Sequence, residues 1–282
     1  MEVAAATGSG RSWRTSAAAS QLVWAAETVV GTILFILLLQ FLFGFSIVDA
    51  SLWEIYWPAF AMGVWGTLGY SAAIVPLSVV LGFTIGIARI SRARVVAAPF
   101  AVFIDFFRGT PPLVIVIFAF LIGPSLLPAR FQGRTLGLAV AVLALAFHSA
   151  SYQAEVFRAG FQSVPRGQLE AAQALGMGPW QSMAHVVLPQ ALRLSLPPLG
   201  NELAVVIKDT SLLAIIGAID LFGVSQDVQQ NLLFTPGYDP RWFLIMWTAV
   251  ALVYFVLTTG MTQFLLFLER RYHVRGIEAM SL

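Results

Sequence analysis

The sequence predicts an all-α integral membrane protein with about six membrane-spanning helices, because it is apolar overall and because long apolar segments recur along it. Of the 282 residues, 59% are hydrophobic and only 11% are charged, and the mean hydropathy is +0.83. A soluble domain carries roughly 25% charged residues. This chain therefore has too few charges to cover a surface that faces water on all sides.

Each expected helix is an apolar segment of about 20 residues or more, the length that crosses roughly 30 Å of hydrocarbon. The segments are Thr28–Val48, Pro58–Ala88, a less clearly bounded one within Val95–Leu127, Thr135–Ala154, Leu199–Ile219 and Trp242–Phe267. The first segment is long and no small-residue cleavage site follows it, which favours a signal anchor over a removed signal peptide.

The arginines orient these helices, since cytoplasmic loops carry an excess of basic residues. An N-terminus in the cytoplasm places most of them inside, namely Arg11, Arg14, Arg89, Arg92, Arg94, Arg158, Arg166, Arg193, Arg270, Arg271 and Arg275. Only Arg130, Arg134 and Arg241 then fall outside. Both termini are therefore expected in the cytoplasm, together with the loop of about Glu155–Pro198.

Charged residues and prolines interrupt every apolar stretch of this loop, so it does not hide another span. Pro165, Pro179 and Pro189 each suit the first turn of a short helix, where the missing N–H would have no partner anyway. Gly176 or Gly178 suits a left-handed residue at the end of such a helix. We expect three short helices that meet at rigid elbows below the membrane.

The loop contains a spaced motif: Glu-Ala-Ala, three residues, Gly, and, nine residues later, an aliphatic-x-Leu-Pro segment. Its residues are Glu170, Ala171, Ala172, Gly176, Leu188 and Pro189. The motif resembles the EAA loop of permease subunits of ABC importers, the loop that receives the ATPase subunit in that family. On local physics alone, the alternative is an ordinary structured loop in which Glu170 compensates a helix N-terminus.

Further segments in the same order resemble permeases for polar amino acids, and together they cover about residues 60–270. They are Gly66-Thr67-Leu68, Phe107-Arg108-Gly109-Thr110-Pro111, Glu155-Val156-Phe157-Arg158-Ala159-Gly160, Gly167-Gln168-Leu169-Glu170, Leu188-Pro189-Gln190-Ala191-Leu192-Arg193 and Lys208-Asp209-Thr210-Ser211-Leu212. Many family members begin at the Gly-Thr-Leu helix, so residues 1–56 add a membrane-spanning helix here.

The resemblance implies a type I ABC importer transmembrane domain in a bacterial inner membrane. Its core is expected at residues 57–270, with a coupling loop at about 158–198 and a cytoplasmic tail at 271–282. An ATPase subunit dimer would dock on the six motif residues, and a second permease subunit, identical or paralogous, would complete the pathway. A periplasmic or surface solute-binding protein would dock on the outer loops, roughly Asp49–Trp57, Gly123–Arg134 and Phe222–Arg241. The cargo would be a polar amino acid, or alternatively an opine, cystine or another small polar solute.

The sequence excludes several other activities for the chain itself. Lys208, its one lysine, follows Ala204-Val205-Val206-Ile207 and not a glycine loop, so there is no P-loop, and ATP and Mg²⁺ would bind the partner ATPase. There is no cysteine, the three histidines show no ligand spacing, and a net charge of +2 is too small to suggest nucleic acid. We expect no cofactor, no metal site and no enzymatic activity in this chain.

Lys208, Asp209, Thr210 and Ser211 are expected near the middle of the fifth span, where charge is costly and marks a pathway or a paired site. Adjacent residues on a helix do not face each other, so Lys208 and Asp209 each need another partner. Two interpretations stay open: the segment lines or gates the translocation route, or it forms a structural ion pair between helices. An ion-coupled transporter that uses both residues as a relay would be supported by inverted repeats, and we see none.

Asp105 and Arg108 lie three residues apart and can pair on one helix, before Thr110-Pro111-Pro112 breaks that helix. A broken helix is tolerated at membrane depth where its freed backbone groups face protein or water. Because an amino acid offers a carboxylate that suits arginine, Arg108 and Thr110 are candidate pathway residues. The alternative is an ion pair anchored at the cytoplasmic interface.

Two further pairs are expected to be structural. Glu155 and Arg158 repeat the three-residue spacing at the inner end of the fourth span, and we assign them to a helix end in preference to a pore. Gly82 and Gly86 form a small-xxx-small pair that lets two helices approach closely.

Overall fold

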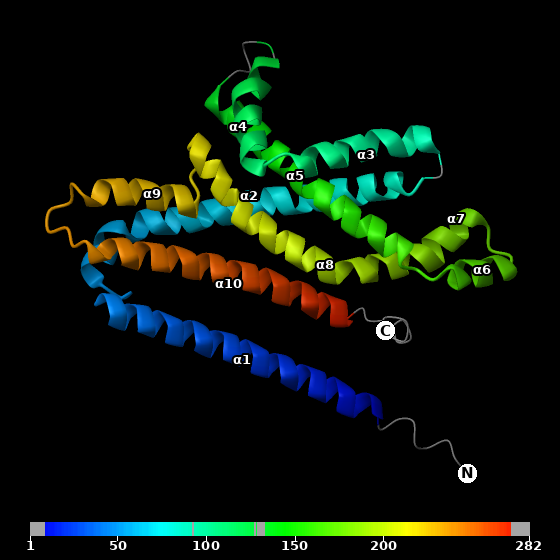
Figure 1. Cartoon of the computed structure of the whole chain (residues 1–282), viewed down its shortest axis with the longest axis horizontal. Coiled ribbons are helices and arrows are strands. Elements are labelled where there is room, and N and C mark those ends of the chain that lie inside the picture. The colour runs from blue at the N-terminus through cyan, green and yellow to red at the C-terminus, as the bar shows by residue number, and fades with distance from the viewer. Residues whose placement is uncertain (1–8, 92, 127, 129–132, 272–282) are drawn as a thin grey trace.

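The computed structural model describes residues 9–91, 93–126, 128 and 133–271, and within these residues every regular element is helical. The elements are α1 (Ser9–Phe43), α2 (Ala50–Arg89), α3 (Arg94–Gly109), α4 (Pro112–Ile122), the 3₁₀ helix η1 (Gly123–Leu126), α5 (Arg134–Gln162), α6 (Arg166–Ala174), α7 (Pro179–Ser182), the π-helix η3 (Met183–Val187), α8 (Leu188–Asp209), the 3₁₀ helix η4 (Thr210–Ile216), α9 (Leu221–Leu232) and α10 (Arg241–Arg271). Most of the long helices follow one axis, with α6 and α7 at one end and the α9–α10 connection at the other (Figure 1). The all-α prediction is confirmed.

Four segments are long and apolar enough to cross a membrane by length and composition: Ala26–Phe43, Ala50–Arg89, Arg134–Gln162 and Arg241–Leu268. α3 and α4 together provide a fifth if they form one span, although they are bent by 105° at their junction. These segments correspond to all the expected spans except the one at Leu199–Ile219.

The prediction of one continuous membrane-spanning helix at Leu199–Ile219 is wrong. α8 begins well before it and ends at Asp209, and the 3₁₀ helix η4 follows directly. Gly217 closes η4 in the left-handed region, with φ of 78°, and the N–H of Ala218 donates to Leu213 O at 3.1 Å. Such a glycine cap satisfies the last helical carbonyls and redirects the chain after Ile216. The apolar residues after Asp209 therefore form a 3₁₀ helix and do not continue the α-helix.

The third short helix expected at Pro189 is instead the start of the long helix α8. Pro189 does lie in the first turn of α8, but the π-helix η3 joins α7 to α8 without a break. The N–H of Leu188 bonds to Met183 O, five residues back. This wider turn accommodates the proline ring, which in a regular α-helix would clash with the carbonyl four residues earlier. The chain from α7 to the end of α8 is therefore one continuous helical segment.

A buried cluster joins most of the membrane helices. Ile74 of α2, Val116 of α4, Leu145 of α5, Val206 of α8 and Leu213 of η4 pack together in it. A separate cluster holds α2 against α9 and α10. The core thus brings segments from both halves of the chain into contact.

α2 and α5 touch at the two glycines of the small-xxx-small pair, which confirms that prediction. A Cβ added to Gly82 would lie 2.7 Å from Gln153 Cβ, and one added to Gly86 would lie 2.9 Å from Ala154 O. Real Cβ atoms do not approach other heavy atoms this closely, so larger residues would force the helices apart.

Gly86→Leu is expected to lower the free energy of unfolding by about 1–3 kcal/mol, the typical cost of overpacking a close contact. The effect is measured as a change in the midpoint of thermal unfolding in detergent, with size-exclusion chromatography used to detect the loss of folded protein. Gly69→Leu is the matched control, because Gly69 lies on the same helix and a Cβ there meets no atom within 4 Å. An equal loss in both variants would contradict the close-packing explanation.

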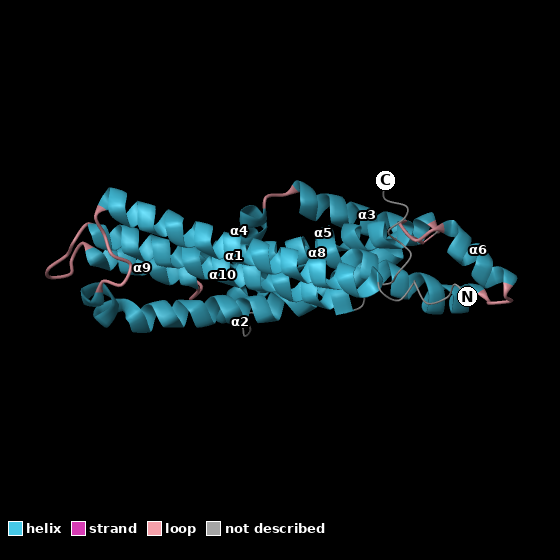
Figure 2. Cartoon of the chain, turned by 90° about the horizontal axis from the view of Figure 1, so that it is seen from below, coloured by secondary structure: helices cyan, strands magenta, loops and turns pink. Residues whose placement is uncertain are grey.

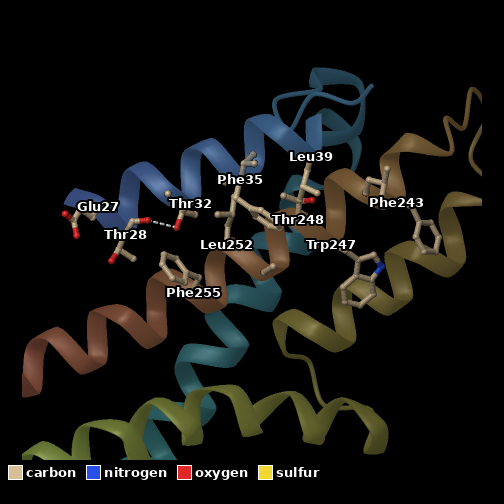
Figure 3. Close-up of a pocket in the computed structure, with 14 residues that line it drawn as sticks. Glu27, Thr28, Thr32, Phe35, Leu39, Phe243, Trp247, Thr248, Leu252 and Phe255 are labelled. Carbon is tan, nitrogen blue, oxygen red and sulfur yellow. Dashed lines mark hydrogen bonds between the residues drawn. The ribbon is translucent and has the colours of Figure 1, made fainter. Parts of the chain in front are cut away.

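α1 is the outermost helix and lies beside α10 (Figure 1), and none of its apolar segment Ala26–Phe43 is buried. Just after its end, Gly44 O accepts a hydrogen bond from Arg241 Nη1 at 3.0 Å, and Phe45 is buried in the core. Between α1 and α10 lies a groove of about 730 Å³ whose lining is mainly apolar, Phe35 and Leu252 included (Figure 3). The added helix is therefore tethered at its C-terminal end.

Candidate functional site

α6 is a short helix at one end of the molecule (Figure 2), and it is bounded by the residues that the sequence predicts. Pro165 precedes it, and Gly176 follows its end with φ of 81°. The N–H of Gly176 donates to Gln173 O at 2.9 Å and that of Met177 donates to Ala172 O at 3.1 Å. These are the bonds of a Schellman motif. Glycine reaches this φ without a Cβ clash, which explains the glycine of the sequence motif.

The exposed residues of the loop include Glu170, Ala171, Leu175, Gly176 and Trp180. We call these residues the loop surface. Leu175 is 84% exposed and Trp180 is 81% exposed. α6 has no acidic residue in its first turn, and the helix dipole acts mainly within that turn. The alternative in which Glu170 compensates a helix N-terminus is therefore wrong.

The remaining motif residues shape the loop from its inner side. Ala172 is buried, and Leu188 and Pro189 are half-buried. Leu188 packs against a cluster that contains Phe161 at the end of α5 and Val187. Sequence reasoning missed Leu175 and Trp180, although two large apolar side chains within an otherwise polar stretch could have indicated them.

The loop is attached to the membrane helices through a close contact of α5 and α8. A Cβ added to Gly160 would collide with Ser195 Oγ and would lie 2.8 Å from Ala191 O. Next to this contact, Arg158 makes a 2.7 Å ion pair with Glu155 near the end of α5. This pair was expected at a helix end, and its position there is confirmed. The base of the loop is thus fixed to α5.

The predicted break after α3 is present, and the protein satisfies the backbone groups that it frees. Thr110 Oγ1 donates to Phe106 O at 2.8 Å. The buried His148 donates from Nδ1 to Phe107 O at 3.0 Å. Two carbonyls that a continuing helix would have paired therefore accept from side chains, and one of these donors lies on α5. The sharp bend is consistent with a polar location inside the bundle.

Arg108 does not pair with Asp105, so this expectation is wrong. Among the described residues the ion pairs are Glu155–Arg158 and Asp239–Arg241. The guanidinium of Arg108 instead lies 5.2 Å from the centre of the Tyr152 ring on α5, an arrangement that attracts a cation to the ring face. The helix spacing permitted a pair with Asp105, but contact with α5 gives Arg108 another partner.

Lys208 and Asp209 are the last residues of α8, and not the middle of a span as expected. Lys208 is exposed and Asp209 is half-buried, and neither takes part in an ion pair within the described residues. A structural ion pair made by these residues is therefore absent from the part of the chain that the structure describes. Thr210 is buried and bonds to Ile207 O at 2.8 Å, and Ser211 bonds to Lys208 O at 2.7 Å.

Glu202 connects the two candidate regions, and sequence reasoning missed it. It lies close enough to Arg108 and to Asp209 to interact electrostatically with both. Its spacing of seven residues from Asp209 on α8 could have indicated it, because residues two turns apart share a helix face. We call Arg108, Glu202, Lys208 and Asp209 the charged cluster.

Two of the expected outer loops, the α1–α2 and α9–α10 connections, lie at the end of the molecule opposite α6 (Figure 1). Arg241 forms a 2.6 Å ion pair with Asp239 there. Hydrogen bonds from Arg241 hold the pKa of the Asp239 carboxyl below its ordinary value, so this pair stays ionised into mildly acidic pH. Because Arg241 also binds Gly44 O, it joins both connections.

A family model described as "Binding-protein-dependent transport system inner membrane component" matches residues 78–274. The glutamine transport system permease protein GlnP of Escherichia coli is 33% identical over 226 residues, which cover 79% of this chain and 98% of GlnP. The inner membrane amino-acid ABC transporter permease protein YhdY of the same organism is 31% identical over 217 residues, which cover 74% of this chain. The match spans only 56% of the length of YhdY.

Solved structures of ABC transporters also match this chain. A crystal structure of an amino acid ABC transporter with histidines has a chain that is 31% identical, with a TM-score of 0.64, over 77% of this chain and 95% of that chain. The MetNI methionine ABC transporter, in inward-facing conformations, is 19% identical with a TM-score of 0.60 and matches in fold alone. α1 lies outside the residues that the family model matches.

Proposed function

Because this chain belongs to the family of binding-protein-dependent transport system inner membrane components, we propose that it carries a polar amino acid through the inner membrane while a separate ATPase hydrolyses ATP. Its fold is that of a type I ABC importer transmembrane domain. The relatives named for glutamine and for amino acids favour this cargo over an opine or cystine.

The observation that carries the proposal is the loop surface. It presents one carboxylate on α6 and two large apolar side chains to solvent, Leu175 just after α6 and Trp180 on α7. Exposed apolar residues gathered in one place mark interaction sites. An ATPase subunit would bury Leu175 and Trp180 and place a complementary charge against Glu170. ATP and Mg²⁺ would bind in that partner.

The continuous segment from α7 to α8 offers a mechanical route from the docked ATPase into the membrane. A movement of the loop would displace α8, because no flexible elbow separates α7 from it. The other end of α8 carries Lys208 and Asp209 of the charged cluster. Nucleotide-driven movement of the loop would therefore reach the polar groups that face the cargo.

The charged cluster suits an amino acid, which carries both signs of charge. Arg108 would bind the carboxylate, since guanidinium and carboxylate form strong charge-assisted hydrogen bonds. Glu202 and Asp209 would attract the ammonium group. Thr110, Thr210 and Ser211 complete the proposed pathway residues, and their hydroxyls also close the ends of α3 and α8.

The assembly would contain two permease subunits, identical or paralogous, and an ATPase dimer on the cytoplasmic side. Both termini and α6 would lie in the cytoplasm, and the solute-binding protein would deliver cargo at the opposite end. The positions of α6 and of the described ends of α1 and α10, all towards one end of the molecule (Figure 1), support this orientation.

ATP-driven uptake tests the proposal. The complete transporter, reconstituted in proteoliposomes with its ATPase and solute-binding protein, should accumulate one or more of labelled L-glutamine, L-arginine and L-glutamate only when ATP is present. Dissipating ion gradients with ionophores should leave the uptake unchanged. Uptake that depends on an ion gradient and does not depend on ATP would contradict the proposal and favour a secondary transporter.

A further inference from the structure

The cavity at the outer end of the bundle has a different chemistry from the grooves elsewhere. It holds about 480 Å³ and is lined from the start of α2, the start of α5, the turn after η4 and α9. Small-molecule sites commonly measure about 300–1,000 Å³. The groove beside α1 and the cavity between α2, α8 and α10 have mainly apolar linings. The outer cavity instead includes charged and amide side chains.

Two opposite charges line the outer cavity from elements that are distant in sequence. Arg134 comes from the start of α5 and Asp227 from α9. They do not form an ion pair with each other, since the ion pairs of the described residues lie elsewhere. The amides of Gln226 and Asn231 also line the cavity. Both charges are therefore available to a ligand that carries charges of its own.

Arg134 is held in place without using all its donors. Its Nη2 donates to Gly217 O at 2.7 Å, which closes the last turn of η4. A guanidinium has five N–H donors in a fixed plane, so others remain for a carboxylate. Asp227 is exposed on α9, and its carboxylate oxygens are hydrogen-bond acceptors. An ammonium group is its natural partner.

We propose that the outer cavity is a second binding site for the cargo, which recognises the α-carboxylate through Arg134 and the α-ammonium through Asp227. These two groups are common to all α-amino acids, so the site binds amino acids without selecting their side chains. This proposal rests on the amino-acid cargo proposed above and adds a stage to its passage.

The position of the cavity fits an entry stage. η4 has Asp209 before its first residue and Gly217 after its last. Its seven residues, at about 2.0 Å each, give it a length of roughly 14 Å. The outer cavity is lined by Ala214 and Gly217 near the C-terminal end of η4, and Asp209 of the charged cluster precedes its start. Cargo released at the outer end therefore meets Arg134 and Asp227 before it reaches Arg108, Glu202 and Asp209.

Asp227→Asn tests the site, in an Arg108→Gln background that removes the proposed inner site. Binding of L-glutamine to the detergent-purified permease–ATPase complex is measured by saturation-transfer NMR. Losing one exposed charge contact should weaken binding about fivefold. L-Arginine should show the same loss, and glutaramic acid, which lacks the α-ammonium, should bind both proteins equally. Glu54→Gln is the matched control, because it removes an exposed carboxylate outside the cavity.

Three outcomes would overturn the outer site: unchanged L-glutamine binding in Asp227→Asn, an equal loss for glutaramic acid, or a loss confined to association of the solute-binding protein. The last would assign the cavity to that protein. ATP-driven uptake by the unmodified transporter separates this result from the proposed function. Normal uptake by the unmodified transporter, together with unchanged L-glutamine binding in Asp227→Asn, would contradict the outer site alone. No amino-acid uptake under any condition would contradict the proposed cargo.

Discussion

Glu170→Arg is expected to abolish co-purification of the permease with its ATPase, and with it the coupled hydrolysis of ATP. Glu170 is exposed on α6 and makes no ion pair among the described residues, so its charge is available to a partner. Reversing a charge within an interface places like charges together and costs several kcal/mol. The affinity should fall by at least about 100-fold, since each 1.4 kcal/mol is a factor of ten.

Gln168→Arg is the matched control for this prediction. Gln168 is also exposed on α6 but lies outside the loop surface, so the same new charge there should leave most of the association intact. Both substitutions are on the surface, where effects on folding are usually within about 0.5 kcal/mol. Full association and coupling of Glu170→Arg would show that the loop surface is not the ATPase dock.

Arg108→Gln is expected to reduce ATP-driven uptake of the amino acid by at least about tenfold while the ATPase still binds. Hydrogen bonds to charged groups contribute about 1.5–3 kcal/mol, and the substitution removes a guanidinium that would hold the cargo carboxylate. Arg108→Lys keeps the charge but loses the bidentate geometry, so it should recover only part of the uptake. Initial uptake rates in proteoliposomes, at several cargo concentrations, measure the effect.

Asp105→Asn separates this role from a structural one. Asp105 lies on the same helix, is exposed, and does not pair with Arg108. Uptake by this variant should equal that of the unmodified protein. If Asp105→Asn were as defective as Arg108→Gln, the two residues would act as a pair, and the cargo contact assigned to Arg108 would be wrong.

Local backbone chemistry made much of the coupling loop predictable. Pro165, Gly176 and Pro179 delimit α6 and α7 as expected, because proline and glycine act through their own φ angles and missing donors. The prediction of a third elbow at Pro189 was wrong for a related reason. A proline in a first turn does not reveal whether the preceding turn is wide enough to continue as helix, and here the π-helix η3 allows it.

Contacts between distant segments were not predictable from one sequence. Helix spacing offered Asp105 as the partner of Arg108, whereas packing of α3 against α5 supplies Tyr152, and α8 brings Glu202 near. The exposure of Leu175 and Trp180 likewise depends on which face of the loop turns toward α5. The functional roles of the loop surface and the charged cluster stay predictions until the variants above are measured.

The sequence by itself determined the membrane class, the family, the apolar spans apart from the fifth, the break after Arg108 and the bounds of α6. The family depends on motifs in order along about residues 60–270, and the others depend on composition or on neighbours within a few residues along the chain. The tertiary structure alone decided the end of α8 at Asp209, the charged cluster, and the meeting of Arg134 with Asp227 at one cavity. These depend on long-range packing, because side chains far apart in sequence come close only when their helices pack together.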